Sequence, residues 1–367
     1  MKSETKYLMA LAQIDGLGPV SLQKLLTFFN SAEACFKASF LDLKKTGLAE
    51  NLIQKIIDGR NRLEPEKLWQ TARREGLEVI TYFDEQYPEL LKTIYAPPLA
   101  LYCRGNTDLF NYQSLAVVGS RKISPYAQNI LPDLLQEAAA GRIVIISGLA
   151  YGVDALAHQI ALDNQGLTMA VAGSGLAWDY LHPAGNRALA KKILNNRGLL
   201  ISEFPPFERG LPFNFPRRNR LISGLSRATL IVEASQKSGA LITAKYALEQ
   251  GREVLAVPGP INQENSRGAN YLIQNGAKAV TSAEDILEIF GLAAGAKKLT
   301  PAFDPGQATA AELMILKTLN SLTLHIDKII EHCTLETPVA NALLMQMELK
   351  GWIKNLGGQK YISLIQL

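Results

Sequence analysis

The sequence predicts an α/β protein with a parallel-sheet core, preceded by a helical domain and followed by a winged-helix-like domain. Between residues 78 and 295, short apolar and β-branched runs alternate with helical patterns. This alternation is typical of right-handed βαβ units, which build one sheet buried on both faces. Residues 1–77 and 309–367 carry mainly helical periodicity, and a stretch without pattern at 296–308 predicts a linker.

The first domain is predicted to be a helical domain of the SAM or helix–hairpin–helix type. Leu17 stands between Gly16 and Gly18, a spacing that allows a tight turn whose N–H groups can point at a phosphate. A second, weaker copy carries Ala49 in place of the second glycine. Such turns also serve simply to pack helices, so DNA contact and packing both remain open for this domain.

Seven apolar runs predict the strands of the middle domain: residues 77–83, 115–120, 142–148, 168–174, 199–204, 229–235 and 253–259. Helical patterns separate most of these runs. Five glycines stand where a helix ends before the next run, the position that favours a left-handed C-cap. These are Gly141, Gly166, Gly198, Gly251 and Gly276.

The last domain, residues 309–367, shows three helical patterns and then two apolar segments around Gly357 and Gly358, which predict a hairpin. This is the winged-helix arrangement, whose third helix often reads duplex DNA. That helix has no arginine, and its polar side chains include Asn341, Gln346, Glu348 and Lys350. A protein contact or a structural role therefore fits as well as DNA recognition.

Composition narrows the class of protein. The net charge of +4 is compatible with nucleic acid but not diagnostic of it. We expect no signal peptide and no membrane span, because no apolar run approaches about 20 residues. The three cysteines are far apart, which predicts buried thiols in a reducing cytoplasm. No cysteine–histidine spacing suggests a metal or haem site, so no cofactor is expected.

Small and polar residues follow the predicted strands, where ligands bind in a doubly wound sheet. Glycine and serine there let N–H groups and hydroxyls approach an anion, and helix N-termini add positive potential. The segments are Gly119-Ser120-Arg121, Ser147-Gly148, Gly173-Ser174-Gly175, Glu203-Phe204-Pro205, Glu233-Ala234-Ser235 and Pro258-Gly259. One further helix opens at Lys237-Ser238-Gly239.

A basic stretch lies between the fifth and sixth predicted strands, residues 199–204 and 229–235. From Gly210 to Arg227 there are four arginines and no acidic residue. Three of them, Arg217, Arg218 and Arg220, follow two phenylalanines. Such a patch suits a ligand with many phosphates and exposed bases, although a solvated basic loop has the same composition. The stretch should reach the same sheet edge as Arg121, which would face it across a pocket.

The sequence motifs of several other classes of nucleotide-binding protein and enzyme are absent. The chain has no GxxxxGK[ST] phosphate loop, no complete dinucleotide fingerprint and no GxSxG elbow. Asp154 and His158 are four apart on one helix face and could perform acid–base work. A helix N-terminal acid and a satisfied core histidine are the simpler interpretation. Glu233 is interpreted as a strand-end residue that orients the arginines.

Several of these motifs, in this order, resemble the DprA (Smf) family of DNA-processing proteins. They are VVGSR (Val117–Arg121), ISGLAYGVDALAH (Ile146–His158), SEFPP (Ser202–Pro206), NFPRRNRLISGLS (Asn214–Ser226), VEAS–KSGALITA (Val232–Ala244) and VPGPINQENSRGANYLIQNGA (Val257–Ala277). Together they cover most of the middle domain. The helical front and the winged-helix-like tail fit the longer members.

The resemblance implies an extended Rossmann-like core that forms a homodimer and binds single-stranded DNA in a basic pocket. It implies a cytoplasmic protein without catalysis of its own, which protects incoming strands in natural transformation and helps load the RecA recombinase. Carried over by motif, the DNA-binding residues are Gly119, Ser120, Arg121, Ser147, Gly148, Arg217, Arg218, Asn219, Arg220 and Ser238. From the residues themselves, Phe213, Phe215 or Tyr180 could stack bases, although proline beside phenylalanine is equally typical of a packed structural turn.

Two points set this chain apart within that resemblance. Members often have a basic residue after a Tyr-Pro in the loop at 175–186, where this chain has Ala184, and Arg187 could substitute. The wider superfamily also includes nucleotide phosphoribohydrolases with a glutamate at the corresponding helix start. Here Thr243 and Ala244 occupy that place. A nucleotide-binding enzyme remains the alternative function, and a pure recombinase adaptor is a third.

Overall fold

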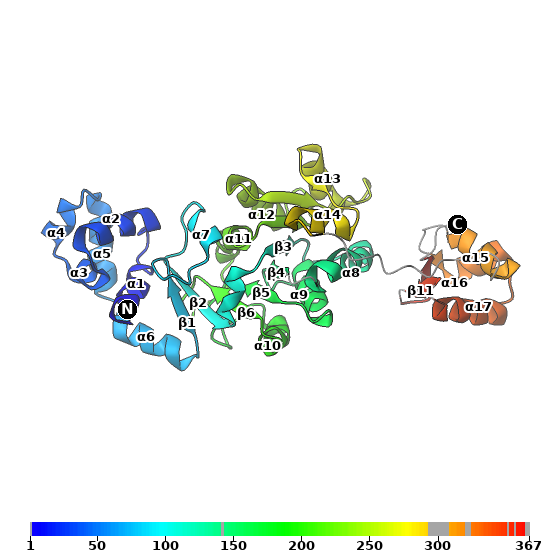
Figure 1. Ribbon diagram of the computed structural model, residues 1–367, viewed down its shortest axis with the longest axis horizontal. Coiled ribbons are helices and arrows are strands. Elements are labelled where there is room, and N and C mark those ends of the chain that lie inside the picture. Colours follow the sequence, from blue (N-terminus) through cyan, green and yellow to red (C-terminus); the bar gives the residue numbers. More distant parts are fainter. Residues whose placement is uncertain are drawn as a thin grey trace. The chain divides into compact units, whose positions relative to one another are not determined.

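The computed structural model describes residues 2–140, 143–292, 308–319, 324–350, 352–355 and 357–363. Gly141, a predicted helix end, and nearly all of the predicted linker lie outside these residues. The chain divides into two compact units, Met1–Ala293 and Ala294–Leu367, and each is described by itself (Figure 1). The domain boundary predicted after residue 77 lies inside the first unit.

The first unit begins with six helices: α1 (Lys2–Leu11), α2 (Pro19–Phe29), α3 (Ala32–Lys37), α4 (Phe40–Lys45), α5 (Glu50–Arg60) and α6 (Pro65–Arg74). Gly16 has a left-handed φ of 82°, and Gly18 is the N-cap of α2. In the second copy, Gly47 has a φ of 70° and Ala49 is the N-cap of α5. The tandem-hairpin pattern of the sequence is confirmed, including its degraded copy.

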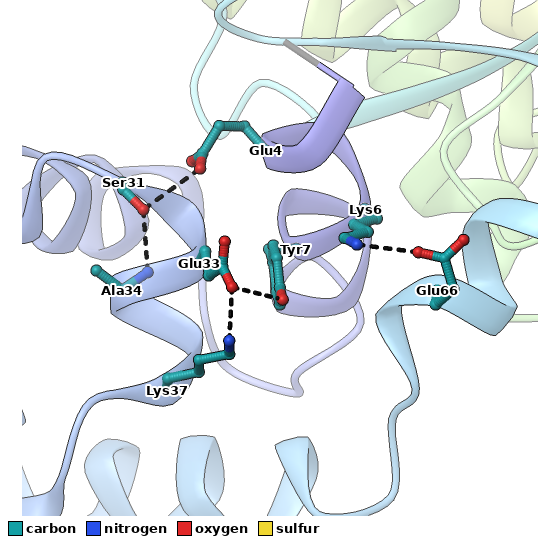
Figure 2. A network of polar contacts seen from close by, with 8 residues as sticks. All are labelled: Glu4, Lys6, Tyr7, Ser31, Glu33, Ala34, Lys37 and Glu66. Carbon is teal, nitrogen blue, oxygen red and sulfur yellow. Dashed lines mark hydrogen bonds and ion pairs between the residues drawn. The ribbon is translucent and has the colours of Figure 1, made fainter.

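Polar contacts join α1 to its neighbours (Figure 2). The Tyr7 hydroxyl donates to the Glu33 carboxylate of α3 at 2.9 Å, and the Lys6 ammonium lies 2.9 Å from Glu66 of α6. Exposed ion pairs contribute little to stability. The helices are therefore held mainly by their fully buried apolar side chains, such as Leu11 and Leu22.

The core of the first unit is a nine-stranded sheet in the order β1-β2-β6-β5-β4-β3-β7-β8-β9. Its strands are β1 (Glu78–Thr81), β2 (Ala100–Gly105), β3 (Ser114–Val118), β4 (Val144–Ser147), β5 (Thr168–Val171), β6 (Leu199–Ser202), β7 (Ala228–Ile231), β8 (Glu253–Ala256) and β9 (Lys278–Ala279). All seven predicted strands are present, and the extended α/β core is confirmed. Strand β2 was not predicted, and it pairs antiparallel with both β1 and β6.

Helices cover the sheet as βαβ units require. They are α7 (Glu89–Lys92), α8 (Pro125–Ala140), α9 (Val153–Asp163), α10 (Arg187–Asn195), α11 (Asn214–Gly224), α12 (Gly239–Glu249), α13 (Glu264–Gln274) and α14 (Ala283–Leu287). Helix α9 packs against α8 and α10, whereas α11 packs against α12 (Figure 1). Helix α11 belongs to the long connection from β6 to β7, and it carries the basic stretch.

The predicted glycine C-caps are only partly correct. Gly251 and Gly276 are left-handed, with φ of 67° and 96°. At the other two sites the preceding residue is left-handed instead, namely Gln165 and Arg197. The glycines that follow these residues are needed for space. A Cβ at Gly198 would lie 2.6 Å from the Ile193 carbonyl oxygen.

The second unit is a winged-helix domain. It contains α15 (Ala310–Leu319), β10 (Leu324–His325), α16 (Ile326–Cys333), α17 (Thr337–Leu349), β11 (Ile353–Asn355) and β12 (Lys360–Ser363), with the sheet order β10-β12-β11. Gly357 and Gly358 have φ of 84° and 59° in the turn between the last two strands. Three helices and a hairpin were predicted, and both are present.

Further sequence inferences concern cysteines, membranes and metals. Cys35, Cys103 and Cys333 are buried free thiols, as predicted. Among the described residues, no helix is long and apolar enough to cross a bilayer. The same residues contain no group of three or more His, Cys, Asp or Glu side chains arranged to bind a metal ion.

Candidate nucleic-acid interface

A pocket of about 440 Å³ lies at the carboxyl ends of the central strands. The strand order reverses between β3 and β7, because β4, β5 and β6 lie to one side and β8 and β9 to the other. Ligands of doubly wound sheets bind at such a reversal. We call this the switch pocket. Its lining includes Gly119, Ser120, Arg121, Ala150, Asp154, Phe215, Arg218, Asn219, Ser238 and Asn265.

The loop after β3 is fixed in place by hydrogen bonds. The Ser120 hydroxyl donates to the Lys122 carbonyl at 2.8 Å and accepts from the Lys122 N–H at 3.1 Å. Farther along, the buried Glu233 carboxylate at the end of β7 accepts from both the N–H and the hydroxyl of Ser124. Glu233 therefore fixes this loop, and the prediction that it orients the arginines is wrong.

Arg121 is the exposed cation of the switch pocket. Its guanidinium carbon lies 5.4 Å from the centroid of the Phe215 ring, a cation–π distance. Among the described residues, its side chain has no ion-pair partner. The His182 ring also lies close to Phe215, with ring centroids 5.3 Å apart. Burial and the positive charges of Arg121 and Arg187 lower the pKa of His182, so the surroundings are electropositive.

Arg218, in contrast, is built into the floor of the pocket. It is 4% exposed, and its guanidinium donates to the carbonyl oxygens of Gly148, at 2.7 Å, and of Val171. Burial lowers its pKa to about 10, and the nearby Asp154 carboxylate opposes that shift. The side chain thus stays charged at neutral pH. Its donors are largely committed to the protein interior, which leaves little for a ligand.

Ser147 and Gly148 lie beneath that floor and do not line the pocket. The Ser147 hydroxyl donates to the Val117 carbonyl at 2.6 Å, and the Gly148 N–H donates to Asp154 at 3.0 Å. A Cβ at Gly148 would lie 2.6 Å from both the Arg218 Nη2 and the Asp154 Oδ2 atoms. Glycine is required here because two charged side chains approach its backbone.

The structure also settles the pair that was considered for acid–base work. The Asp154 carboxylate accepts hydrogen bonds at the start of α9, and His158 Nδ1 lies 2.6 Å from the Thr168 hydroxyl. Burial lowers the pKa of His158 to about 3. The helix N-terminal acid of the simpler interpretation is confirmed, whereas the core histidine is only half satisfied, because its Nε2 has no hydrogen-bond partner among the described residues.

The opposite wall of the switch pocket comes from α11 and α12. The Ser238 hydroxyl caps α12 by accepting from the Ala240 N–H at 3.2 Å. The Asn219 amide reaches across to the Gly239 carbonyl at 3.3 Å. Five residues of α11 line the pocket, four of them at helical spacing (Phe215, Arg218, Asn219 and Ile222) and the fifth being Pro216.

Arg217 and Arg220 face a different pocket, of about 540 Å³, which the hairpin turn at Gly16 also lines. Both arginines pair with Glu203, whose side chain is 3% exposed and whose Oε1 lies 3.2 Å from Arg217 Nε. The three predicted arginines therefore do not converge on one pocket. Glu203 was predicted as a strand-end residue, but its pairing with two arginines was not predicted.

The second pocket carries a small net negative charge. Its lining contains three acidic residues, Asp15, Glu203 and Glu208, against the two arginines, a sum of −1. A polyanion gains little by entering such a site. Phe213, one of the predicted stacking residues, is 67% exposed and lines this second pocket. Only Phe215 of the three predicted aromatics lines the switch pocket, since Tyr180 packs on Phe207 with ring centroids 5.3 Å apart.

Two other predicted cations are also engaged by the protein. The Arg187 guanidinium donates to the Leu181 carbonyl at 3.1 Å and to that of Asp179, so it braces its own loop. In the winged-helix domain, the Lys350 ammonium lies 2.6 Å from Glu312, whose side chain is 1% exposed. These contacts reduce what either residue can offer to a phosphate.

The switch pocket offers little of what the alternative function, a nucleotide-binding enzyme, would need for catalysis. Thr243 and Ala244, at the place of the expected glutamate, are buried in α12. Asp154 is the acidic side chain that lines the pocket within the described chain, and it is engaged by two N–H groups. A general base would need a carboxylate that is free to face a ligand.

Comparison with known proteins agrees with this architecture. Residues 78–291 match the family model of DNA recombination-mediator protein A, and residues 300–359 match that of the DprA winged helix domain. Protein Smf of Synechocystis sp. is 33% identical over 98% of each chain. DNA processing protein DprA of Streptococcus pneumoniae is 38% identical, over 68% of this chain and 96% of that one.

Two solved structures are also similar. That of S. pneumoniae DprA has a TM-score of 0.68 at 34% identity, and covers 77% of this chain and 97% of that one. That of Helicobacter pylori DNA processing protein A, described for its single-stranded DNA binding mode, has a TM-score of 0.53 at 27% identity. It covers 59% of this chain and 97% of that one. With the family model spanning most of the α/β core, this chain belongs to the DprA (Smf) family of DNA-processing proteins.

Proposed function

We propose that the protein binds single-stranded DNA in the switch pocket, with little dependence on base sequence. The observation that carries this proposal is Arg121, an exposed guanidinium over the Phe215 ring at the reversal of the strand order. A cation beside an aromatic face offers one partner to a phosphate and another to a base. The described strand-binding mode of the H. pylori relative supports the same ligand class.

The charges near the pocket set its expected salt dependence. Lys122 and Lys237 adjoin the lining residues Arg121 and Ser238, and both are exposed. Three cations that neutralise three phosphates of a single strand predict that log affinity falls with log salt at a slope of about −2. Removal of one cation should reduce that slope by about 0.7.

The test is fluorescence anisotropy of a labelled strand of about 30 nucleotides and of its duplex, across a salt series. We expect the wild type to prefer the single strand, and Arg121→Ala to weaken binding to all sequences alike with a shallower salt slope. Arg74→Ala is the matched control, because Arg74 is an exposed arginine of α6 that lines neither pocket. A preference for duplex or for one sequence, or equal binding by wild type and Arg121→Ala, would refute the proposal.

We further propose that this binding protects incoming strands and promotes loading of a RecA recombinase in natural transformation and recombination. The protein would act in the cytoplasm as a homodimer, without catalysis of its own. Family membership supports these assignments. Light scattering of the purified protein measures its oligomeric state. A strand-exchange assay with RecA and a single-strand binding protein measures loading, and Arg121→Ala should lose the stimulation in proportion to its lost affinity.

A further inference from the structure

Tyr151 is an exposed aromatic residue beside the switch pocket. It lies in the loop between β4 and α9, and its side chain is 50% exposed. Its neighbour Ala150 lines the pocket. A Cβ at Gly185 would lie 2.7 Å from the Tyr151 hydroxyl oxygen and 3.1 Å from Cε1, so the ring lies directly against this glycine. Among the described residues, the hydroxyl has no hydrogen-bond partner.

The loop that carries Tyr151 is held from both sides. The Asn186 amide donates to the carbonyl oxygens of Leu149, at 2.8 Å, and of Ala150, at 3.1 Å. The Asp154 carboxylate accepts from the Ala150 N–H at 3.3 Å. Leu149 is fully buried and has a left-handed φ of 58°, so its side chain anchors a constrained backbone. The position of the Tyr151 backbone is therefore fixed before any ligand arrives.

The other end of the loop lies against Arg121. Gly152 has a φ of 77°, and a Cβ there would lie 2.6 Å from the Arg121 carbonyl oxygen. The Val153 N–H donates to the Ser120 carbonyl at 3.1 Å. Tyr151 thus adjoins a residue that packs against the backbone of the pocket's exposed cation. The exposed Tyr151 ring is therefore carried by a loop whose backbone contacts that of Arg121.

We infer that Tyr151 stacks a base of the single strand next to the nucleotide held at the switch pocket. An aromatic ring on a preorganised loop loses little conformational entropy when a base stacks on it. Stacking is tolerant of sequence because every base has a π face, in agreement with a pocket that binds phosphate without reading bases. This inference rests on the proposed function, since it concerns the same strand at the same site.

The experiment compares binding of a DNA strand that carries bases with binding of a strand that has only the sugar–phosphate backbone. An oligothymidine of about 12 nucleotides and an abasic strand of equal length are titrated into wild type, Tyr151→Ala and Tyr151→Phe. We expect Tyr151→Ala to bind oligothymidine about 5- to 150-fold more weakly, the range for one stacked base, with unchanged affinity for the abasic strand. Tyr151→Phe keeps the ring and should bind both strands as the wild type does.

Tyr112→Ala is the matched control. Tyr112 is 41% exposed and lies just before β3, at the amino edge of the sheet, so its loss should change neither affinity. The inference is overturned if Tyr151→Ala binds oligothymidine like the wild type. It is also overturned if that variant loses affinity for both strands equally, because the loop would then act through its backbone. A wild type that binds neither strand refutes the proposed function itself.

Discussion

Replacement of Glu203 by glutamine should destabilise the first unit without weakening DNA binding. The Glu203 side chain is 3% exposed and pairs with Arg220, whose side chain is 13% exposed. Removal of one partner of a buried ion pair costs about 3–5 kcal/mol, because the other charge is left uncompensated. Glutamine still accepts a hydrogen bond, so we expect a loss of about 2–3 kcal/mol in the free energy of unfolding.

Thermal unfolding followed by circular dichroism measures this loss. For a unit of this size, about 2–3 kcal/mol corresponds to a decrease of about 3–5 °C in the melting temperature. Glu203→Gln combined with Arg220→Met removes both charges and should recover part of the loss. The matched control is Glu264→Gln, which breaks the exposed 3.1 Å pair with Arg267 and should change stability by less than about 1 kcal/mol.

The second measurement on Glu203→Gln is its affinity for single-stranded DNA. The second pocket has a net charge of −1, which Glu203→Gln only brings to zero, so the affinity of this variant for single-stranded DNA should stay within about twofold of the wild type. The reasoning fails if Glu203→Gln leaves the melting temperature unchanged, because Glu203 would then not stabilise the protein as the buried partner of the arginines. It also fails if affinity rises several-fold, since Glu203 would then be masking arginines that bind DNA.

Three further variants test the surroundings of the site and the tail. Burial lowers the pKa of His158 from 6.5 to about 3, so at pH 5 the unfolded chain binds a proton that the folded protein does not. Stability should fall by about 2 kcal/mol between pH 7 and pH 5 through this residue, and urea unfolding of His158→Gln should lack that portion of the pH dependence. Gly148→Ala should cost about 1–3 kcal/mol in chemical denaturation, whereas Gly239→Ala, with no atom within 4 Å of its new Cβ, should not destabilise the protein. Lys350→Met should lower the calorimetric melting temperature of the winged-helix unit by several degrees, because it leaves the buried Glu312 carboxylate without its cation.

Much of the fold was predictable because the spacing of apolar residues along the chain reflects which side chains are buried. Each predicted strand of the core is apolar on both faces, as a sheet covered by helices requires. Strand β2 was not predicted because it follows Pro97-Pro98 and carries the charged Arg104 just before its last residue, Gly105. The left-handed conformation of Gln165 and Arg197 at two helix ends was not predicted. Tertiary contacts, and not local preference, determine which residue becomes left-handed there.

The candidate site was only partly predictable. That the strand-end residues Ser120 and Ser238 share one pocket follows from topology, since parallel strands end at the same edge. The division of the arginines follows from helix geometry, which the basic stretch did not reveal while it was treated as a loop. On a helix, residues three or four apart share a face and adjacent residues do not. Arg217 and Arg220 accordingly face Glu203, while Arg218 points to the other side.

This division changes what the basic stretch can do in the proposed function. Of its four arginines, Arg217 and Arg220 share a carboxylate and Arg218 serves the pocket floor. The fourth, Arg227, directly precedes β7 and so lies at the amino edge, away from the switch pocket. The stretch therefore contributes more to folding than to attraction of phosphate, and the exposed arginine that lines the switch pocket is Arg121, from another segment. Substitutions in the stretch should thus lower stability first, and a loss of binding specific to Arg121 would separate the two roles.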